Sequence, residues 1–108
     1  MAMVWVWLAL QTFWIYSSSM WYVYVLESKI DNQKYVGLAD NLARRIKLHN
    51  SGKVFSTKNR KPLGIIYCEV YLNKNDAAAR EQFLKSGWGK NYLGKVLSNY
   101  IKSKKLGG

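Results

Sequence analysis

The stretch YVYVLESKIDNQKYVGLADNLARRIKLH, residues 22–49, decides the fold. Residues 21–28 alternate their side chains between two faces and are rich in β-forming residue types, which predicts a strand. Asp31 and Asn32 supply turn chemistry in the polar segment 29–33, and residues 34–38 resume the β pattern. The stretch therefore predicts a β-hairpin. We expect its second strand to end at Gly37, where a side chain would obstruct a close approach.

A helix is predicted directly after the hairpin. Asp40 or Asn41 can cap its first turn, and Ser-Gly at residues 51–52 can stop it after about Asn50. Side chains four residues apart share a helix face, and two such stripes run along this helix, one apolar and one polar: Leu42 and Ile46, and Asn41, Arg45 and His49. We expect the apolar stripe to pack in the core and the polar stripe to face a ligand.

Composition sets the limits within which this stretch must fold. The chain has 108 residues, enough for one small domain with one core. Its formal charge of +11 favours polyanionic partners, nucleic acid first and an anionic membrane second, because each neutralised phosphate releases counterions. Cys68 is the single cysteine, so it forms no internal disulfide and indicates a reducing, cytoplasmic location with a packing role.

Residues 1–19 differ from the rest of the chain because they carry no charged side chain. The run is short for a membrane span, Gln11 and Thr12 interrupt its middle, and it lacks the basic start of a secretory signal. Three interpretations stay open. Met20 is the natural initiator and residues 1–19 are not part of the native product; the segment is a membrane or hydrophobic anchor; or it packs on the domain formed by residues 20–108.

The remaining chain continues with alternating element types. Residues 53–61 form a basic polar loop, and residues 63–72 an apolar strand that suits a buried central position. Asn73 or Asn75 caps a helix to about Ser86; a Gly-Trp-Gly break at residues 87–89 precedes a final helix from about Asn91. The order predicts an α/β (α+β) fold, a small three-stranded, mostly antiparallel sheet flanked by helices.

Four short motifs, in this order, carry a resemblance to a known family. They are Tyr22-Val23-Tyr24; Tyr35-Val36-Gly37; Leu42, Arg45 and His49; and Ala77, Glu81 and Lys85. Over about residues 20–95 the chain resembles the GIY-YIG nucleases, and most of all their short single-domain bacterial members. One departure is that Tyr22 stands where the first motif has glycine. The resemblance implies a GIY-YIG nuclease-like domain at residues 20–108.

The resemblance also implies roles for five residues in metal-dependent hydrolysis of DNA phosphodiester bonds. Tyr24 would be the general base, which requires a nearby cation because a phenol has a pKa of about 10. Tyr35 would share the attacking water or a phosphate oxygen, and Arg45 would stabilise charge on the phosphate. His49 would hold a phosphate or water, and Glu81 would bind Mg²⁺ or Mn²⁺.

Further basic residues are expected to contact the DNA backbone: Arg44, Lys47, Lys53, Lys58, Arg60, Lys61 and Lys85. The expected substrate is structured or damaged DNA, as in DNA repair, with specificity from DNA shape or from a partner protein. Simpler readings remain, since Tyr24 and Tyr35 can be core residues and Glu81 can pair with Lys85. The alternative function is a non-catalytic nucleic-acid-binding module, membrane-associated through residues 1–19.

Overall fold

A three-stranded antiparallel sheet forms the centre of the domain. The computed structural model describes residues 20–107, so the three interpretations of residues 1–19 lie outside the described residues. The strands are β1 (Trp21–Ser28), β2 (Lys34–Ala39) and β3 (Leu63–Tyr71), in the order β2-β1-β3. Both neighbours of β1 are antiparallel to it. The predicted fold class, a small three-stranded antiparallel sheet flanked by helices, is confirmed.

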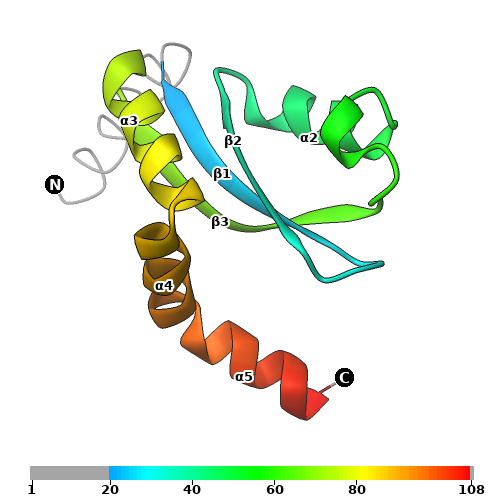
Figure 1. The fold of residues 1–108 in the computed structure, drawn as a ribbon. Helices are drawn as coiled ribbons and strands as arrows, with labels where there is room; N and C mark the ends of the chain where they lie inside the picture. The colour runs from blue at the N-terminus through cyan, green and yellow to red at the C-terminus, as the bar shows by residue number, and fades with distance from the viewer. Residues whose placement is uncertain (1–19, 108) are drawn as a thin grey trace, which may run out of the picture.

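Helices cover both faces of this sheet (Figure 1). Helix α2 (Leu42–Asn50) lies on one face, and α3 (Lys74–Lys85) lies on the other. Helices α4 (Gly87–Val96) and α5 (Ser98–Gly107) continue from the end of α3 as an arm (Figure 1). Between α2 and β3, a short 3₁₀ helix, η1 (Phe55–Thr57), interrupts the loop. No helix among residues 20–107 is both long and apolar enough to span a bilayer.

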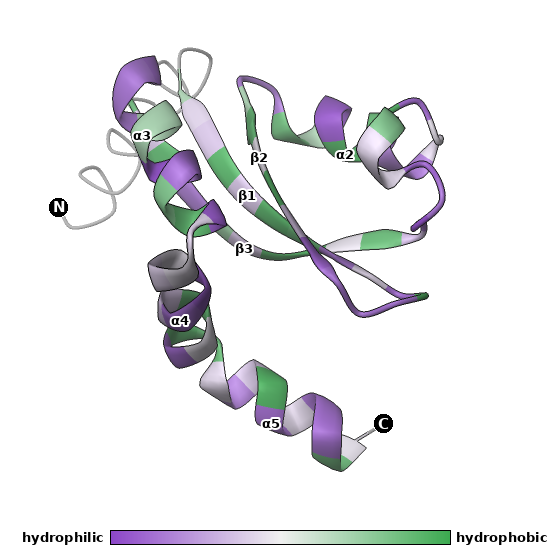
Figure 2. Cartoon of the chain, viewed as in Figure 1, coloured by the Kyte–Doolittle hydropathy of each residue, from purple (hydrophilic) through white to green (hydrophobic). Residues whose placement is uncertain are grey.

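Alternation along β1 separates two apolar clusters. Val23 and Val25 face α3 and α4, whereas Tyr24 and Leu26 face α2 with Leu42 and Ile46, the predicted core stripe. Green and paler segments accordingly alternate along β1, and the hairpin end is purple apart from its green tip (Figure 2). Tyr24, the predicted site residue on β1, therefore points toward α2.

The prediction that β3 is central is wrong. β1 holds the central position, and β3 is an edge strand on which Ile65 and Val70 are exposed. Both strands are apolar runs, and periodicity alone does not rank two such runs by burial. Gly37 also lies inside β2, which continues to Ala39, so its predicted role as the end of the strand is wrong.

The prediction of a break at residues 87–89 is wrong as well. Those residues form the first turn of α4, capped by the Ser86 hydroxyl, which accepts from the Gly89 N–H. A Cβ on Gly89 would lie 2.8 Å from the Leu84 carbonyl carbon and closer still to other backbone atoms of α3. Gly89 therefore permits the close contact of the two helices. The single helix predicted from Asn91 is two helices that meet at Leu97.

Candidate active site

Tyr24 occupies the centre of the α2 face of the sheet. Its Cα pairs with that of Gly37 across β1 and β2, and the tyrosine is fully buried. A Cβ on Gly37 would lie 2.9 Å from Cε1 of Tyr24 and closer still to Cζ and the hydroxyl oxygen. The glycine therefore lets the tyrosine ring cross the edge strand. A close approach at Gly37 was expected from the sequence, and the approaching group is Tyr24.

The hydroxyl of Tyr24 meets His49, which lies in the last turn of α2. The oxygen lies 2.9 Å from His49 Nε2, and His49 Nδ1 lies 2.7 Å from the hydroxyl oxygen of Thr57 in η1. All three residues are fully buried. The structure differs here from the predicted role of His49, because both ring nitrogens are bonded within the protein and neither can hold a phosphate.

The charge state of His49 makes this a directional chain of hydrogen bonds. Burial first, and the Arg45 charge second, lower the pKa of His49 from 6.5 to about 4, so the ring is neutral near pH 7. The positive charge of Arg45 beside the Tyr24 oxygen favours an arrangement in which the tyrosine hydrogen points to His49 Nε2. On this basis we assign the hydrogen of neutral His49 to Nδ1, which donates it to the Thr57 hydroxyl oxygen. The neutral His49 ring is therefore a base in contact with the Tyr24 hydroxyl.

The pKa of Tyr24 differs from what a general base on its own would need. Burial raises it above 10.0, and this effect outweighs the hydrogen bond and positive charge of Arg45, which lower it. The prediction that the basic helix would make Tyr24 a competent base is therefore not met in the free protein. Tyr24 is a neutral phenol here, and it can accept a proton only if it passes its own to His49.

Arg45 lies one turn before His49 on the same face of α2. Its Nε is buried and has no hydrogen-bond partner among the described residues, and its pKa is raised, chiefly by hydrogen bonding to Tyr24. The arginine also lines a cavity of about 210 Å³ between α2 and the ends of β1 and β2. The neighbouring Arg44 lines the same cavity, but its side chain is exposed and lies 3.7 Å from Asp40. A donor without a partner beside a cavity suits an anionic oxygen.

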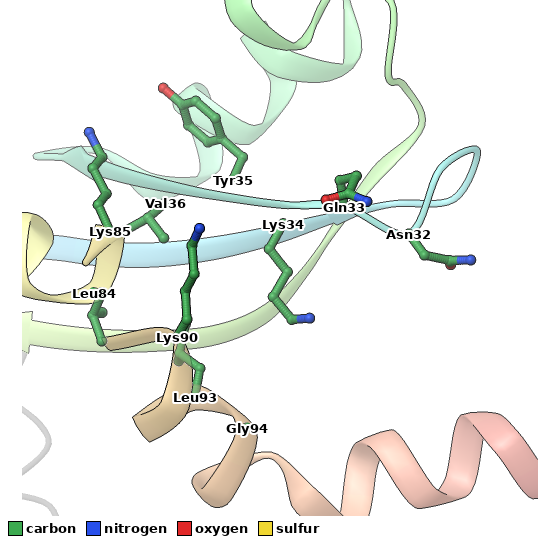
Figure 3. Close-up of a pocket in the computed structure, with 10 residues that line it drawn as sticks. All are labelled: Asn32, Gln33, Lys34, Tyr35, Val36, Leu84, Lys85, Lys90, Leu93 and Gly94. Carbon is green, nitrogen blue, oxygen red and sulfur yellow. The ribbon is translucent and has the colours of Figure 1, made fainter. Parts of the chain in front are cut away.

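Tyr35 is the more accessible of the two tyrosines. It is half-buried on β2, with its ring centroid 4.8 Å from that of His49 and 6.3 Å from that of Tyr24. Its side chain projects from β2 and packs in the apolar cluster on the α2 face (Figure 3). Tyr35 therefore covers the buried pair and is exposed to an incoming substrate.

Glu81 comes from α3, on the opposite side of the sheet. Its side chain is 16% exposed, and its Oε2 lies 3.6 Å from Lys85 Nζ. This is the ion pair that the sequence offered as an alternative to metal binding. Its charge still reaches the site, because it is one of the groups that raise the pKa of Tyr24. Residues 20–107 contain no group of three or more potential metal-ligating His, Cys, Asp or Glu side chains. A single carboxylate fits Mg²⁺, which keeps most of its water ligands.

The predicted DNA contacts fall into two groups. Six of them are exposed, five on α2 and the following loop and one on α3: Arg44, Lys47, Lys53, Lys58, Lys61 and Lys85. Arg60 differs, because its Nε donates to Asp31 at 3.2 Å and its guanidinium also donates to the Lys34 carbonyl. The predicted backbone contact by Arg60 is therefore replaced by a structural role that ties the loop to the hairpin.

Thr57 is a member of the site that the sequence did not single out. It lies eight residues after His49 in a polar loop, and η1 turns its hydroxyl inward. Its one signal was its residue type, a hydroxyl among basic side chains, which does not distinguish a buried partner from a surface residue.

Comparison with known proteins identifies the family of the chain. The model of the GIY-YIG catalytic domain matches residues 20–92. The chain is 38% identical over 82 residues to UPF0213 protein CPE1444 of Clostridium perfringens, covering 75% of this chain and 87% of the relative. It is 37% identical over 65 residues to UPF0213 protein YazA of Bacillus subtilis, covering 59% and 65%.

A solved structure is also similar. The solution structure of UPF0213 protein BH0048 from Bacillus halodurans shares 34% identity, with a TM-score of 0.46, over 71% of this chain and 84% of that chain. The family match spans more than half of the present sequence and includes all five residues of the predicted site. The chain therefore belongs to the GIY-YIG catalytic domain family, a family of nucleases.

Proposed function

We propose that the protein is a metal-dependent endonuclease that hydrolyses phosphodiester bonds in DNA. One observation carries the proposal: the buried hydrogen-bond chain from Tyr24 through His49 to Thr57 lies beside an arginine whose Nε has no partner among the described residues. A tyrosine that only packs in a core needs one hydrogen-bond partner for its hydroxyl. The Tyr24 hydroxyl instead lies between a neutral base, His49, and a cation, Arg45. That is an arrangement for moving a proton.

The proposed reaction uses His49 as the final proton acceptor. A water molecule attacks the phosphorus; as its oxygen bonds to phosphorus, its proton passes to the Tyr24 oxygen and the Tyr24 proton passes to His49 Nε2. The bond from phosphorus to the leaving oxygen breaks, and that oxygen is protonated from solvent. Because Tyr24 is fully buried in the free protein, the attacking water must enter with the substrate, past Tyr35.

Arg45 and Glu81 would stabilise the charge of this reaction from two sides. The Arg45 guanidinium would donate to the nonbridging phosphate oxygens, where negative charge accumulates. Glu81 would hold Mg²⁺ or Mn²⁺, which when bound would stabilise the leaving oxygen. We extend the proposal to structured or damaged DNA in the cytoplasm, as in DNA repair, with specificity from DNA shape or a partner protein.

Nicking of supercoiled plasmid and of branched duplexes, with and without Mg²⁺ or Mn²⁺, tests the proposal. Arg45→Ala and Glu81→Ala should each lower the cleavage rate by about 10²-fold or more, and EDTA should abolish cleavage. Arg44→Ala removes the same charge one residue away and should weaken binding while leaving the chemistry intact. Equal nicking by wild type and both site variants would show that a contaminating nuclease cuts the DNA.

A second candidate function is nucleic-acid binding without turnover. The observation that favours it is the buried Tyr24 hydroxyl with its raised pKa, a resting state that needs substrate-driven rearrangement before chemistry. It predicts salt-dependent DNA binding that survives Glu81→Ala, with no metal-dependent cutting of any DNA structure.

A further inference from the structure

A cavity of about 450 Å³ lies on the α3–α4 side of strand β2. Its wall on the sheet comes from the hairpin and the first half of β2, and its opposite wall from the end of α3 and from α4 (Figure 3). The residues that give it its chemistry are three lysines and three apolar side chains: Lys34, Lys85, Lys90, Val36, Leu84 and Leu93. Its volume falls in the usual range for a small-molecule site.

The cavity combines an apolar floor with a cationic rim. Leu84 is fully buried and Leu93 nearly so, whereas the three lysines are exposed. No aspartate or glutamate lines the cavity. Among the described residues, Lys34 and Lys90 form no ion pair, and Lys85 lies 3.6 Å from Glu81. An occupant with a flat apolar body and a negative charge fits this lining, which is the chemistry of one nucleotide.

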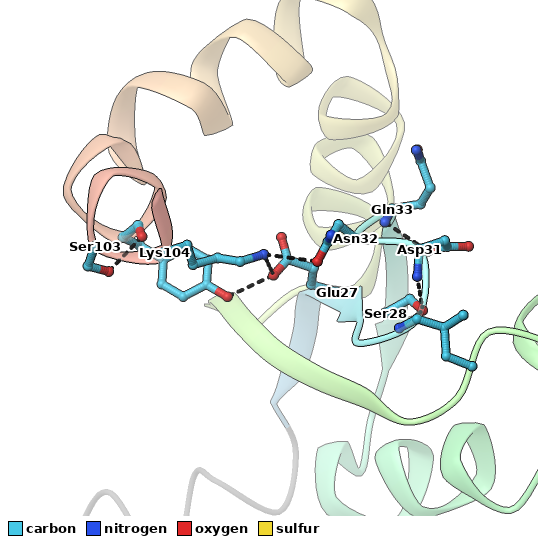
Figure 4. Close-up of polar contacts among 9 residues, drawn as sticks. Glu27, Ser28, Asp31, Asn32, Gln33, Ser103 and Lys104 are labelled. Atoms are coloured by element: carbon cyan, nitrogen blue, oxygen red, sulfur yellow. Dashed lines mark hydrogen bonds and ion pairs between the residues drawn. The ribbon is translucent and has the colours of Figure 1, made fainter. Parts of the chain in front are cut away.

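At the hairpin, the cavity wall is bonded to helix α5. Asn32, at the tip of the hairpin, lines the cavity and accepts a hydrogen bond of 3.3 Å from Lys104. Lys104 and Tyr100 also donate to the buried carboxylate of Glu27, at 2.6 and 2.8 Å (Figure 4). These contacts fix the hairpin against the helical arm, so the cavity is a built feature of the fold.

The cavity and the proposed catalytic site lie on opposite faces of the edge strand β2. Tyr35 lines the cavity and also packs against His49, and Lys85 joins the cavity to Glu81. β2 is an edge strand, so no further strand separates the two, and every second residue of its outer edge presents unpaired backbone groups. The cavity lies along the first half of β2, and the cavity that contains Arg45 lies at the end of the same strand. A DNA strand that follows this edge can therefore reach both.

We propose that this cavity binds one nucleotide that is unpaired next to the cleaved bond, so that the substrate is DNA with an extrahelical nucleotide such as a bulge. The inference rests on the proposed function and names the substrate class of that site. A paired base must leave its stack to reach the cavity, which costs free energy that an unpaired base has already lost. The lysines hold its phosphate, and the apolar floor covers one face of the base.

Gly94 allows the cavity to be filled without disturbing the fold. It lies on α4 and lines the cavity, and a Cβ built on it has no atom within 4 Å. Gly94→Phe therefore places an aromatic ring at the mouth of the cavity, and glycine replacement favours a helix. Gly107→Phe is the matched control, because Gly107 is equally open, also helical, and not among the residues that line the cavity.

The test is a binding measurement in EDTA, in which no metal-dependent cleavage occurs. Fluorescence anisotropy at fixed salt compares a duplex with one unpaired 2-aminopurine to the same duplex fully paired, for wild type and both variants. We expect wild type and Gly107→Phe to prefer the bulged duplex by about tenfold and Gly94→Phe to lose this preference, with an unchanged or higher Tm. The 2-aminopurine emission should change on binding to wild type and not to Gly94→Phe.

The inference is overturned if wild type binds both duplexes equally, or if both glycine variants lose the preference alike. It is also overturned if deoxyadenosine 5′-monophosphate binds in a Gly94→Phe-sensitive way while the bulged duplex has no advantage, since the cavity would then serve free nucleotides. Nicking is measured separately with Mg²⁺. Cutting without a bulge preference removes the inference alone, and a bulge preference without cutting removes the proposed nuclease function.

Discussion

Gly37→Ala adds one methyl group at the point where Tyr24 crosses β2. The new Cβ would meet the tyrosine ring at less than van der Waals distance at three atoms, among them Cε1 at 2.9 Å. The clashing atoms belong to a side chain, but an aromatic ring is rigid, and this one is fully buried. The ring must therefore tilt away from β2, and its hydroxyl must leave His49.

The cost follows from three contributions. Forcing a methyl group into a packed site costs about 1–3 kcal/mol, and leaving the buried Nε2 of His49 without its partner costs about 1–3 kcal/mol. Alanine restricts the unfolded chain more than glycine does, which returns about 0.4–1 kcal/mol. We expect Gly37→Ala to lower the free energy of unfolding by about 3 kcal/mol, a large share of the total for a domain of this size.

Gly64→Ala is the matched control for urea unfolding and for plasmid nicking. Gly64 lies in the other edge strand of the same sheet, and a Cβ there would lie 3.5 Å from Lys29 Cε, an ordinary contact. We expect this variant to match or slightly exceed wild-type stability and to keep its cleavage rate, while Gly37→Ala loses both. Equal urea midpoints for the two variants would refute the tight packing of Tyr24 on Gly37.

Three further predictions concern the buried polar groups. The pKa of His49 is about 4 in the folded protein and 6.5 in the unfolded chain, so the stabilisation that neutral His49 contributes is complete above pH 6.5 and is lost as the pH falls toward 4. This loss amounts to about 3 kcal/mol in the wild type. Urea unfolding at pH 7 and pH 4 should therefore show a smaller fall in the free energy of unfolding for His49→Gln than for wild type. Thr57→Val should keep the volume and remove the partner of His49 Nδ1, lowering stability by about 1–2 kcal/mol and slowing nicking. Burial raises the pKa of Glu27, but hydrogen bonds from Lys104 and Tyr100 outweigh this effect and hold the pKa below 4.5. Glu27→Gln removes the charge that these two residues of α5 bind, so it should speed the amide hydrogen exchange of α5 by about tenfold.

Local chemistry made the hairpin and α2 predictable. Asn41 caps α2 by accepting from the Arg44 N–H, and Asn73 caps α3, as their residue types indicated. These signals act within a few residues and need no knowledge of the rest of the chain. The position of β3 and the start of α4 were missed, because each depends on which element packs against it.

The same distinction divides the candidate site. The shared face of Arg45 and His49 follows from helical spacing alone, and in the structure both residues lie near Tyr24. Whether His49 faces solvent or the interior depends on η1, which lies across its ring and supplies Thr57. Sequence spacing therefore indicated which residues meet, and tertiary packing decided that both ring nitrogens of His49 have partners within the protein.

The departure at Tyr22 is explained by the same packing. Tyr22 pairs with Ala39, two residues along the strands from the pair of Tyr24 with Gly37. The space that Tyr24 needs is made entirely on β2, where Gly37 has no side chain. A glycine at position 22 would open room over Ala39, where no side chain of the hydrogen-bond chain lies. The two glycines of the family's paired motif are therefore not equivalent here: Gly37 determines where the Tyr24 hydroxyl lies, and position 22 can carry a bulky residue while the route from Tyr24 to His49 stays intact.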